Sequence, residues 1–134
     1  MSIVVGYIPT PEGRAALDAA CAEAKERRRS LIVVNSHKGG ASFDGEDAIA
    51  AEEALSAVER ELKEAGVTFT IRELVRGNDP TEDMISVAEE VGASLIVIGL
   101  RRRTPVGKLI LGSNAQKLLL EADCPVLAVK APRT

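Results

Sequence analysis

The sequence predicts an α/β fold, in which helices cover both faces of a parallel sheet. Five short apolar runs alternate with four helix-like segments, which is the pattern of repeated βαβ units. All but one of the runs are continuously apolar, as expected for strands that are buried on both faces. The predicted strands cover residues 3–5, 31–34, 67–71, 95–98 and 126–129.

The third of these strands is predicted to lie at an edge of the sheet. Val67, Phe69 and Ile71 alternate with polar residues, so only one of its faces is apolar. A strand of this kind keeps one face in the core and the other in water. The alternation therefore places it at the edge and not at the centre.

The helices carry start and stop signals. Thr10-Pro11 and Asp79-Pro80 each place a capping side chain before a proline at the first helical position, and a glutamate three residues after Asp79 completes a capping box. Gly66 is suited to the left-handed residue that closes the second helix. The apolar stripes of the second and fourth helices are Ala48, Ala51, Leu55, Val58, Leu62 and Ala65, and Ala115, Leu118, Leu119 and Ala122. The polar stretch 36–45 is predicted to be a surface loop.

Length and composition narrow the class of protein. The chain has 134 residues, and we expect one domain over residues 1–134. The net charge of −3 gives no basic field, so nucleic acid is not an expected partner. Cys21 and Cys124 have no second pair, which fits neither a disulfide framework nor a zinc site. No apolar stretch approaches the ~20 residues that span a bilayer, so we expect a cytoplasmic protein without a membrane partner.

The segment between the fourth strand and the last helix holds residues suited to ligand binding. Gly112 lets a ligand approach the backbone, and Ser113 begins a helix whose free N–H groups face an anion placed there. The same residues have a second interpretation, because Ser113 and Gln116 also form an ordinary capping box that needs no ligand. The spacing leaves both interpretations open. A Walker-type phosphate site is excluded, because Leu109 follows Lys108 where a Ser or Thr would hold the metal.

Three stretches carry a family resemblance that covers nearly the whole chain. They are Val4-Val5-Gly6-Tyr7 with Pro11-Glu12-Gly13-Arg14-Ala15-Ala16-Leu17, Gly77-Asn78-Asp79-Pro80 with Leu95-Ile96-Val97-Ile98-Gly99, and Leu111-Gly112-Ser113 with Cys124-Pro125-Val126-Leu127-Ala128-Val129. On these stretches the chain resembles the universal stress proteins, in their single-domain form. The resemblance implies a Rossmann-like fold of the adenine nucleotide alpha hydrolase type, with strand order 3-2-1-4-5 and a ligand crevice between strands 1 and 4.

The resemblance also implies a site for an adenine nucleotide, namely ATP with Mg²⁺. Nucleotide-binding members have a glycine, two residues, a second glycine, nine residues, and then Gly with Ser or Thr. This chain departs at Arg102, which replaces the second glycine, and at Ile8, which stands where these members carry an acidic residue. Ile8 cannot accept a hydrogen bond from a ribose hydroxyl or help to hold a metal. The predicted nucleotide-binding residues are Thr10, Ser36, Ile98, Gly99, Arg102, Gly112, Ser113 and Asn114.

A run of arginines accompanies the predicted phosphate end. Arg101, Arg102 and Arg103 lie near the positive end of the last helix, which is unfavourable for cations without an anion. Guanidinium groups hold phosphate oxygens in two-point contacts. The run at 27–29 instead complements the negative end of the first helix, so an arginine run is not by itself evidence for a ligand. The placement favours a bound phosphate or carboxylate, with a solvated loop as the alternative.

No residue pattern indicates a catalytic centre. His37 is the single histidine and falls in the predicted loop, with no cysteine near it in sequence. A nucleophile and a base therefore cannot be paired. We expect a binding module with at most slow, incidental ATP hydrolysis. An enzyme that acts on adenylated or phosphorylated substrates through the same crevice is the outside alternative.

The fifth strand is predicted to form a homodimer interface. In the order 3-2-1-4-5 it lies at an edge although it is continuously apolar, and an exposed edge of this kind pairs with another chain. Universal stress proteins commonly dimerise through this strand. The predicted interface residues are Val126, Leu127, Ala128 and Val129. A dimeric regulatory or interaction protein of the same fold that binds no nucleotide is the alternative function.

Overall fold

The computed structural model describes residues 2–8, 10–37, 45–75, 80–103, 108–109 and 112–131. Strands and helices alternate along the chain as predicted, apart from a small hairpin after the fourth strand. In chain order the elements are β1 (Ser2–Gly6), α1 (Pro11–Arg27), β2 (Ser30–His37), α2 (Gly45–Ala65), β3 (Phe69–Val75), α3 (Pro80–Val91), β4 (Leu95–Leu100), β5 (Arg102–Arg103), β6 (Lys108–Leu109), α4 (Ser113–Glu121) and β7 (Val126–Lys130).

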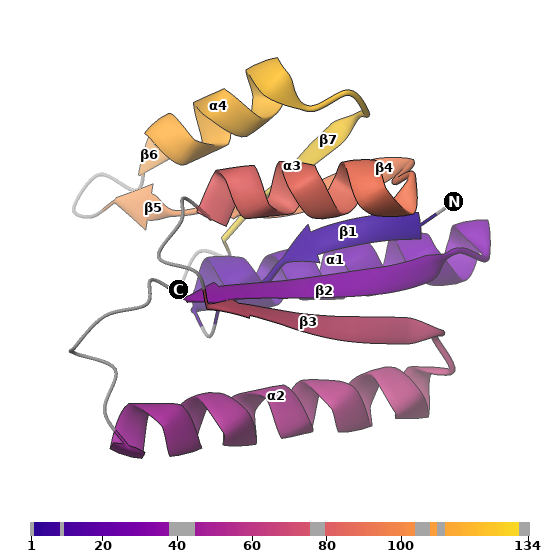
Figure 1. Cartoon of the computed structure of the whole chain (residues 1–134), viewed down its shortest axis with the longest axis vertical. Coiled ribbons are helices and arrows are strands. Elements are labelled where there is room, and N and C mark those ends of the chain that lie inside the picture. The colour runs from indigo at the N-terminus through magenta and orange to yellow at the C-terminus, as the bar shows by residue number, and fades with distance from the viewer. Residues whose placement is uncertain are drawn as a thin grey trace.

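Five strands form one parallel sheet in the order β3-β2-β1-β4-β7, which confirms the predicted order 3-2-1-4-5 (Figure 1). Strand β1 is central, and its Ile3 lies beside Leu31 of β2 and Leu95 of β4. Strand β3 is an edge, as its alternating sequence predicts, and β7 is the other edge. The strand order reverses between β1 and β4, which is where open α/β sheets bind ligands.

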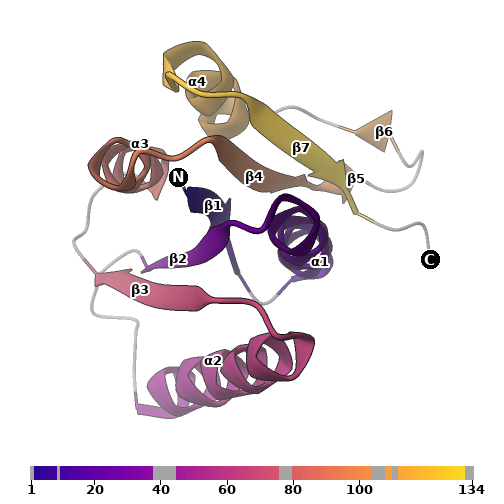
Figure 2. The same ribbon diagram turned by 90° about the vertical axis from the view of Figure 1, so that its right-hand side faces the viewer.

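Two helices cover each face of the sheet (Figure 2). Successive residues of a strand point to opposite faces, so Ile3 packs in the core under α1 and α2, and Val4 packs under α3 and α4. Both side chains are fully buried. The buried stripe of α2 includes Leu55, Val58 and Leu62, as predicted.

Strand β3 begins later than predicted because α2 uses the N–H group of Val67. Gly66 has a φ of 75°, and the Val67 N–H donates to the Leu62 carbonyl at 3.2 Å. This is the hydrogen bond of a glycine-closed helix end. Val67 is therefore buried in the core without joining the ladder, and the strand starts at Phe69.

Two segments predicted to be loops contain strand residues. Strand β2 continues through His37, which pairs with Val75 of β3, so the loop begins later than residue 36; its remaining positions up to 44 lie outside the described residues. In the segment after β4, Arg102 and Arg103 pair antiparallel with Leu109 and Lys108. Each of these strands has only two residues, too few for a periodic sequence signal.

Helix α4 has a narrower buried face than predicted. Leu118 is buried, and Ala115 and Ala122 pack beside it, but Leu119 is 41% exposed. The prediction that Leu119 joins the buried stripe is wrong, because this helix at the border of the sheet is covered along one narrow line only. Leu120 is 85% exposed. Within the described ranges, no helix has the length and apolar character needed to cross a membrane.

Helix α1 is capped at both ends. The Thr10 Oγ1 accepts a hydrogen bond from the Gly13 N–H at 3.1 Å, and Pro11 is the first helical residue, as predicted. The other predicted cap, at Asp79, lies outside the described residues. Helix α1 ends at Arg28, which adopts the left-handed conformation with a φ of 54°. Glycine is usual at this place, because a Cβ atom makes the conformation unfavourable.

Arg28→Gly is expected to raise the free energy of unfolding by about 0.5 to 1 kcal/mol, because it relieves that steric cost. Urea denaturation followed by circular dichroism measures the change. Arg27→Gly is the matched control. It removes the same charge from the last helical residue and should lower stability by about 1 kcal/mol. A loss of stability in Arg28→Gly would contradict the expectation.

Candidate functional site

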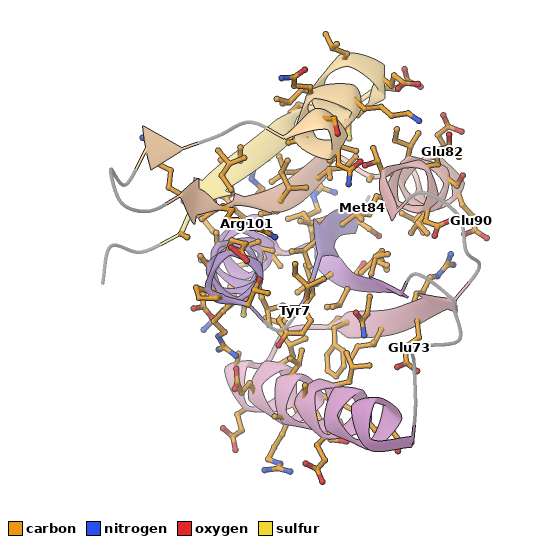
Figure 3. The ribbon with its side chains drawn as sticks, turned by 90° about the vertical axis from the view of Figure 1, so that its left-hand side faces the viewer. Tyr7, Glu73, Glu82, Met84, Glu90 and Arg101 are labelled. Carbon is orange, nitrogen blue, oxygen red and sulfur yellow. The ribbon has the colours of Figure 1, made fainter. Side chains whose placement is uncertain are left out.

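A cleft opens at the carboxyl ends of β1 and β4, where the strand order reverses. One part of it is a cavity of about 290 Å³, called here the apolar cavity. Its wall includes the apolar side chains of Tyr7, Val34, Met84, Ile98, Ala115 and Leu118. Met84 and Tyr7 lie on opposite sides of the end of β1, toward α3 and toward α1 and α2 respectively (Figure 3).

A second cavity of about 270 Å³, called here the α4 cavity, adjoins the first. Leu100, Arg101 and Gly112 line it and do not line the apolar cavity. The residues common to both cavities are Ile8, Glu12, Gly99, Asn114 and Ala115. The two cavities therefore form one cleft, with an apolar compartment at one end and the start of α4 at the other.

Glycine residues let α1 pack closely against the strand ends. A Cβ atom on Gly99 would overlap the carbonyl oxygen of Glu12, and one on Gly13 would overlap the carbonyl oxygen of Ile8. Backbone atoms cannot move aside as the end of a side chain can. Gly99 is therefore required by the packing of α1 on β4, irrespective of any ligand.

Gly112 is different from these glycines. It is the N-cap of α4 with a φ of −67°, which any residue adopts, and a Cβ atom built on it meets nothing within 4 Å. Neither the backbone conformation nor packing among the described residues requires glycine here. The N-cap of α4 is Gly112 and not Ser113, so the capping box predicted with Ser113 as the cap does not form. The start of α4 therefore borders the α4 cavity with a glycine as its N-cap, whose backbone is open to a ligand.

The charged residues among those described along the cleft are Glu12 and Arg101. Arg101 is exposed and follows β4 directly, at the side of the α4 cavity (Figure 3). Glu12 lies in the first turn of α1. The neighbouring Arg102 pairs with Leu109 in the β5–β6 hairpin, so the backbone turns away from the parallel sheet there.

Hydrogen bonds fix the walls of the cleft. The Thr81 hydroxyl donates to the Asn114 carbonyl at 3.3 Å, which ties the first turn of α4 to α3. On the opposite wall the Tyr7 N–H donates to the Val34 carbonyl at 2.9 Å. Burial raises the pKa of Tyr7, so its hydroxyl group stays protonated at neutral pH. The cleft walls are therefore neutral and ordered apart from Glu12 and Arg101.

The described residues hold no recognisable catalytic or metal centre. Burial raises the pKa values of both Cys21 and Cys124, which is the opposite of an activated thiolate. Within the described part of the chain, no group of three His, Cys, Asp or Glu side chains is placed to hold a metal ion. His37 belongs to β2, and its side chain lies outside the described set.

The structure brings half of the predicted nucleotide-binding residues to the cleft. Ile98, Gly99, Gly112 and Asn114 line it. Thr10 caps α1, and Ser113 is the exposed first residue of α4. Ser36 and Arg102 lie in β2 and β5, with side chains outside the described set. The roles of all eight residues in ligand binding stay predictions.

Sequence reasoning missed three polar or flexible residues that line the apolar cavity, which are Glu12, Thr81 and Met84. Each lies in the first turns of a helix that follows a strand. In a parallel sheet the helices that follow the strands begin around the ligand crevice. The first residues of each predicted helix after a strand are therefore candidate site residues, and the sequence shows where they lie. Thr81 and Met84 follow Pro80 closely, so the proline marks them as residues of such a helix start.

Comparison with known proteins assigns the sequence and the fold to one family. The model of the universal stress protein family matches residues 1–130. The chain belongs to this family. A universal stress protein of Mycolicibacterium smegmatis is 48% identical over 96% of this chain and 96% of that protein. The resemblance carried by the three sequence stretches is confirmed.

Solved universal stress proteins share this architecture. A structure from Archaeoglobus fulgidus is 39% identical, with a TM-score of 0.82 over 97% of this chain and 98% of that chain. Another from Archaeoglobus fulgidus, solved in complex with dAMP, is 34% identical, with a TM-score of 0.77 over 97% of this chain and 98% of that chain. The α/β fold with strand order 3-2-1-4-5 is therefore shared with universal stress proteins.

The two cleft glycines are expected to differ in their effect on stability. Gly99→Ala should lower the free energy of unfolding by about 1 to 3 kcal/mol, because the new methyl group overlaps the Glu12 carbonyl oxygen. Gly112→Ala is the matched control and should lower it by less than about 1 kcal/mol, the ordinary difference between glycine and alanine at an N-cap. Chemical denaturation measures both variants. Equal stability of the two would show that α1 does not depend on Gly99 for its position.

Proposed function

We propose that this universal stress protein is an adenine-nucleotide-binding module of the stress response. The observation that carries the proposal is the two-part cleft at the reversal of strand order, whose α4 cavity lies beside a helix start with glycine as its N-cap and beside Arg101. The dAMP complex of a relative that is 34% identical supports this class of ligand. The proposal includes ATP with Mg²⁺ as a ligand.

In the proposed complex the base occupies the apolar cavity and the phosphates occupy the α4 cavity. Val34, Met84 and Ile98 provide apolar surface for the base. The N–H groups at the start of α4, around Gly112, Ser113 and Asn114, face the phosphates. Arg101 adds a guanidinium group at the same end, which compensates for the missing second glycine of the motif.

The proposed activity is binding and not catalysis. The raised thiol pKa values lower the thiolate fraction of Cys21 and Cys124 at neutral pH, which disfavours a nucleophilic role. Neutral Tyr7 cannot act as a base at physiological pH. We propose that nucleotide binding regulates the association of this single cytoplasmic domain with itself or with other proteins.

Calorimetric titration of the nucleotide-stripped protein tests the proposal, using AMP and then ATP with and without Mg²⁺. We expect saturable binding with a Kd on the order of micromolar. Gly112→Val should weaken binding about tenfold or more without loss of stability, because its side chain extends into open space beside the α4 cavity.

Arg101→Gln should also weaken binding about tenfold, through loss of a charge-assisted contact to phosphate. Arg29→Gln is the matched control, since it removes an exposed arginine that does not line the cleft. Absence of heat and of thermal stabilisation at millimolar nucleotide would leave protein association as the function. If Arg101→Gln and wild type bind nucleotide with equal affinity, Arg101 does not contact the phosphates.

We also propose a homodimer through strand β7. Its Pro125 carbonyl accepts from the Ile96 N–H at 3.0 Å, and the Ala131 N–H donates to the Leu100 carbonyl at 3.1 Å, so alternate residues face β4. The backbone groups of residues 126, 128 and 130 consequently face the open edge. Val126, Leu127, Ala128 and Val129 are half-buried in the monomer. An apolar edge with free backbone groups is complementary to a second copy of itself.

Ala128→Pro is expected to convert the dimer to a folded monomer. It removes an N–H group from the open edge of β7, while the hydrogen bonds between β7 and β4 stay intact. Sedimentation gives the mass, and circular dichroism gives the fold. Ala128→Val keeps the N–H group and should remain a dimer. A folded Ala128→Pro variant with the mass of a dimer would show that the interface lies on another surface.

A further inference from the structure

Glu12 occupies a distinctive place in the cleft. It lines both the apolar cavity and the α4 cavity, and its Cβ lies 3.0 Å from the place where a Cβ on Gly99 would stand. Its carboxylate has no hydrogen-bond or ion-pair partner within the described part of the chain. The first turn of α1 is electrostatically favourable for this negative charge.

The residues that line both cavities mark the position of the sugar. If the base lies in the apolar cavity and the phosphates lie at the start of α4, the sugar that joins them lies against the residues common to both cavities. Only Glu12 and Asn114 among these have polar side chains. Ionised Glu12 is the one whose side chain only accepts hydrogen bonds. The side chain of Ile8, which lines both cavities beside Glu12, offers the sugar no acceptor.

We propose that Glu12 is the specificity-determining residue of the cleft, and that its carboxylate accepts hydrogen bonds from the 2′- and 3′-hydroxyl groups of a ribose. This inference rests on the proposed nucleotide binding and goes beyond it, since it names the side chain by which this chain distinguishes ribose from the deoxyribose of the relative's dAMP. Glu12 thus supplies, from the first turn of α1, the acceptor that Ile8 lacks.

Selection against deoxyribose follows from the desolvation of the carboxylate. A bound nucleotide displaces water from Glu12, and the ribose hydroxyls return hydrogen bonds to it. A 2′-deoxyribose returns fewer, so part of the carboxylate is left without a partner in a confined space. Sites built to bind a hydroxyl group discriminate strongly against analogues that lack it. Contacts of the base and the phosphates do not change between these ligands, so the difference reports on the sugar alone.

The test is the affinity of wild type and variants for AMP, 2′-deoxy-AMP and 3′-deoxy-AMP, measured by calorimetry at one ionic strength. We expect wild type to bind AMP at least about tenfold more tightly than 2′-deoxy-AMP. Glu12→Ala should reduce this ratio to less than about twofold, mainly by weakening AMP. Glu12→Gln should give an intermediate ratio, because its amide oxygen still accepts but carries no charge.

Glu82→Gln is the matched control. Glu82 also lies in the first turn of a helix, but it pairs with Lys117 at 2.9 Å and points outward from α3, away from the cleft (Figure 3). It should retain the wild-type ratio. Thermal denaturation of each variant separates a change at the sugar from loss of fold.

The outcomes distinguish this inference from the function on which it rests. Tight binding of AMP and 2′-deoxy-AMP with equal affinity by wild type would overturn the role of Glu12 and leave nucleotide binding intact. An unchanged ratio in Glu12→Ala would do the same, by assigning the discrimination to another residue. Failure of wild type to bind any of the three nucleotides would overturn the proposed function, and this inference with it.

Discussion

The close approach of α1 to the end of β4 is the contact on which the cleft depends. With glycine at position 99, the backbone of Glu12 lies where a side chain of β4 would otherwise stand, and Gly13 gives the same close approach to the carbonyl of Ile8. Only glycine permits such backbone contact. The contact holds the first turn of α1 beside the carboxyl ends of β1 and β4, and so places Glu12 in the wall of both cavities. A role in ligand contact is not needed to explain the glycine at position 99.

The fold was predictable from the sequence because its signals are local and repeated. Continuous apolar runs, an alternating edge strand, and caps such as Thr10 each reflect one physical requirement that the structure meets directly. The errors occur where two requirements compete. Val67 has the pattern of a strand, but the closure of α2 at Gly66 takes its N–H group. Leu119 fits a helical stripe, but the border of the sheet covers only a narrow line of α4.

The site was predictable in position but not in composition. The strand order implied by the family resemblance and the glycine before α4 locate the crevice, and Gly112 lies beside it in open space. The importance of Glu12 could not be derived from its sequence context, because a glutamate in the first turn of a helix is also an ordinary partner of the helix dipole. Its position along the two cavities appears only when α1 is packed on β4. The short hairpin at Arg102 had no periodic signal at all.

The cleft and the open edge of the sheet lie on neighbouring strands, β4 and β7, so the two proposed associations are not structurally independent. In β4, Ile98 and Gly99 line the cleft and pair directly with Ala128 and Val129 of β7. Neighbouring strands lie about 4.8 Å apart, and the interior that joins them is close-packed. A ligand that contacts the Gly99 backbone therefore acts one strand away from the edge that a second copy would cover. If the nucleotide binds the monomer and the dimer with different affinities, the two equilibria are thermodynamically linked. The apparent affinity for nucleotide would then change with protein concentration.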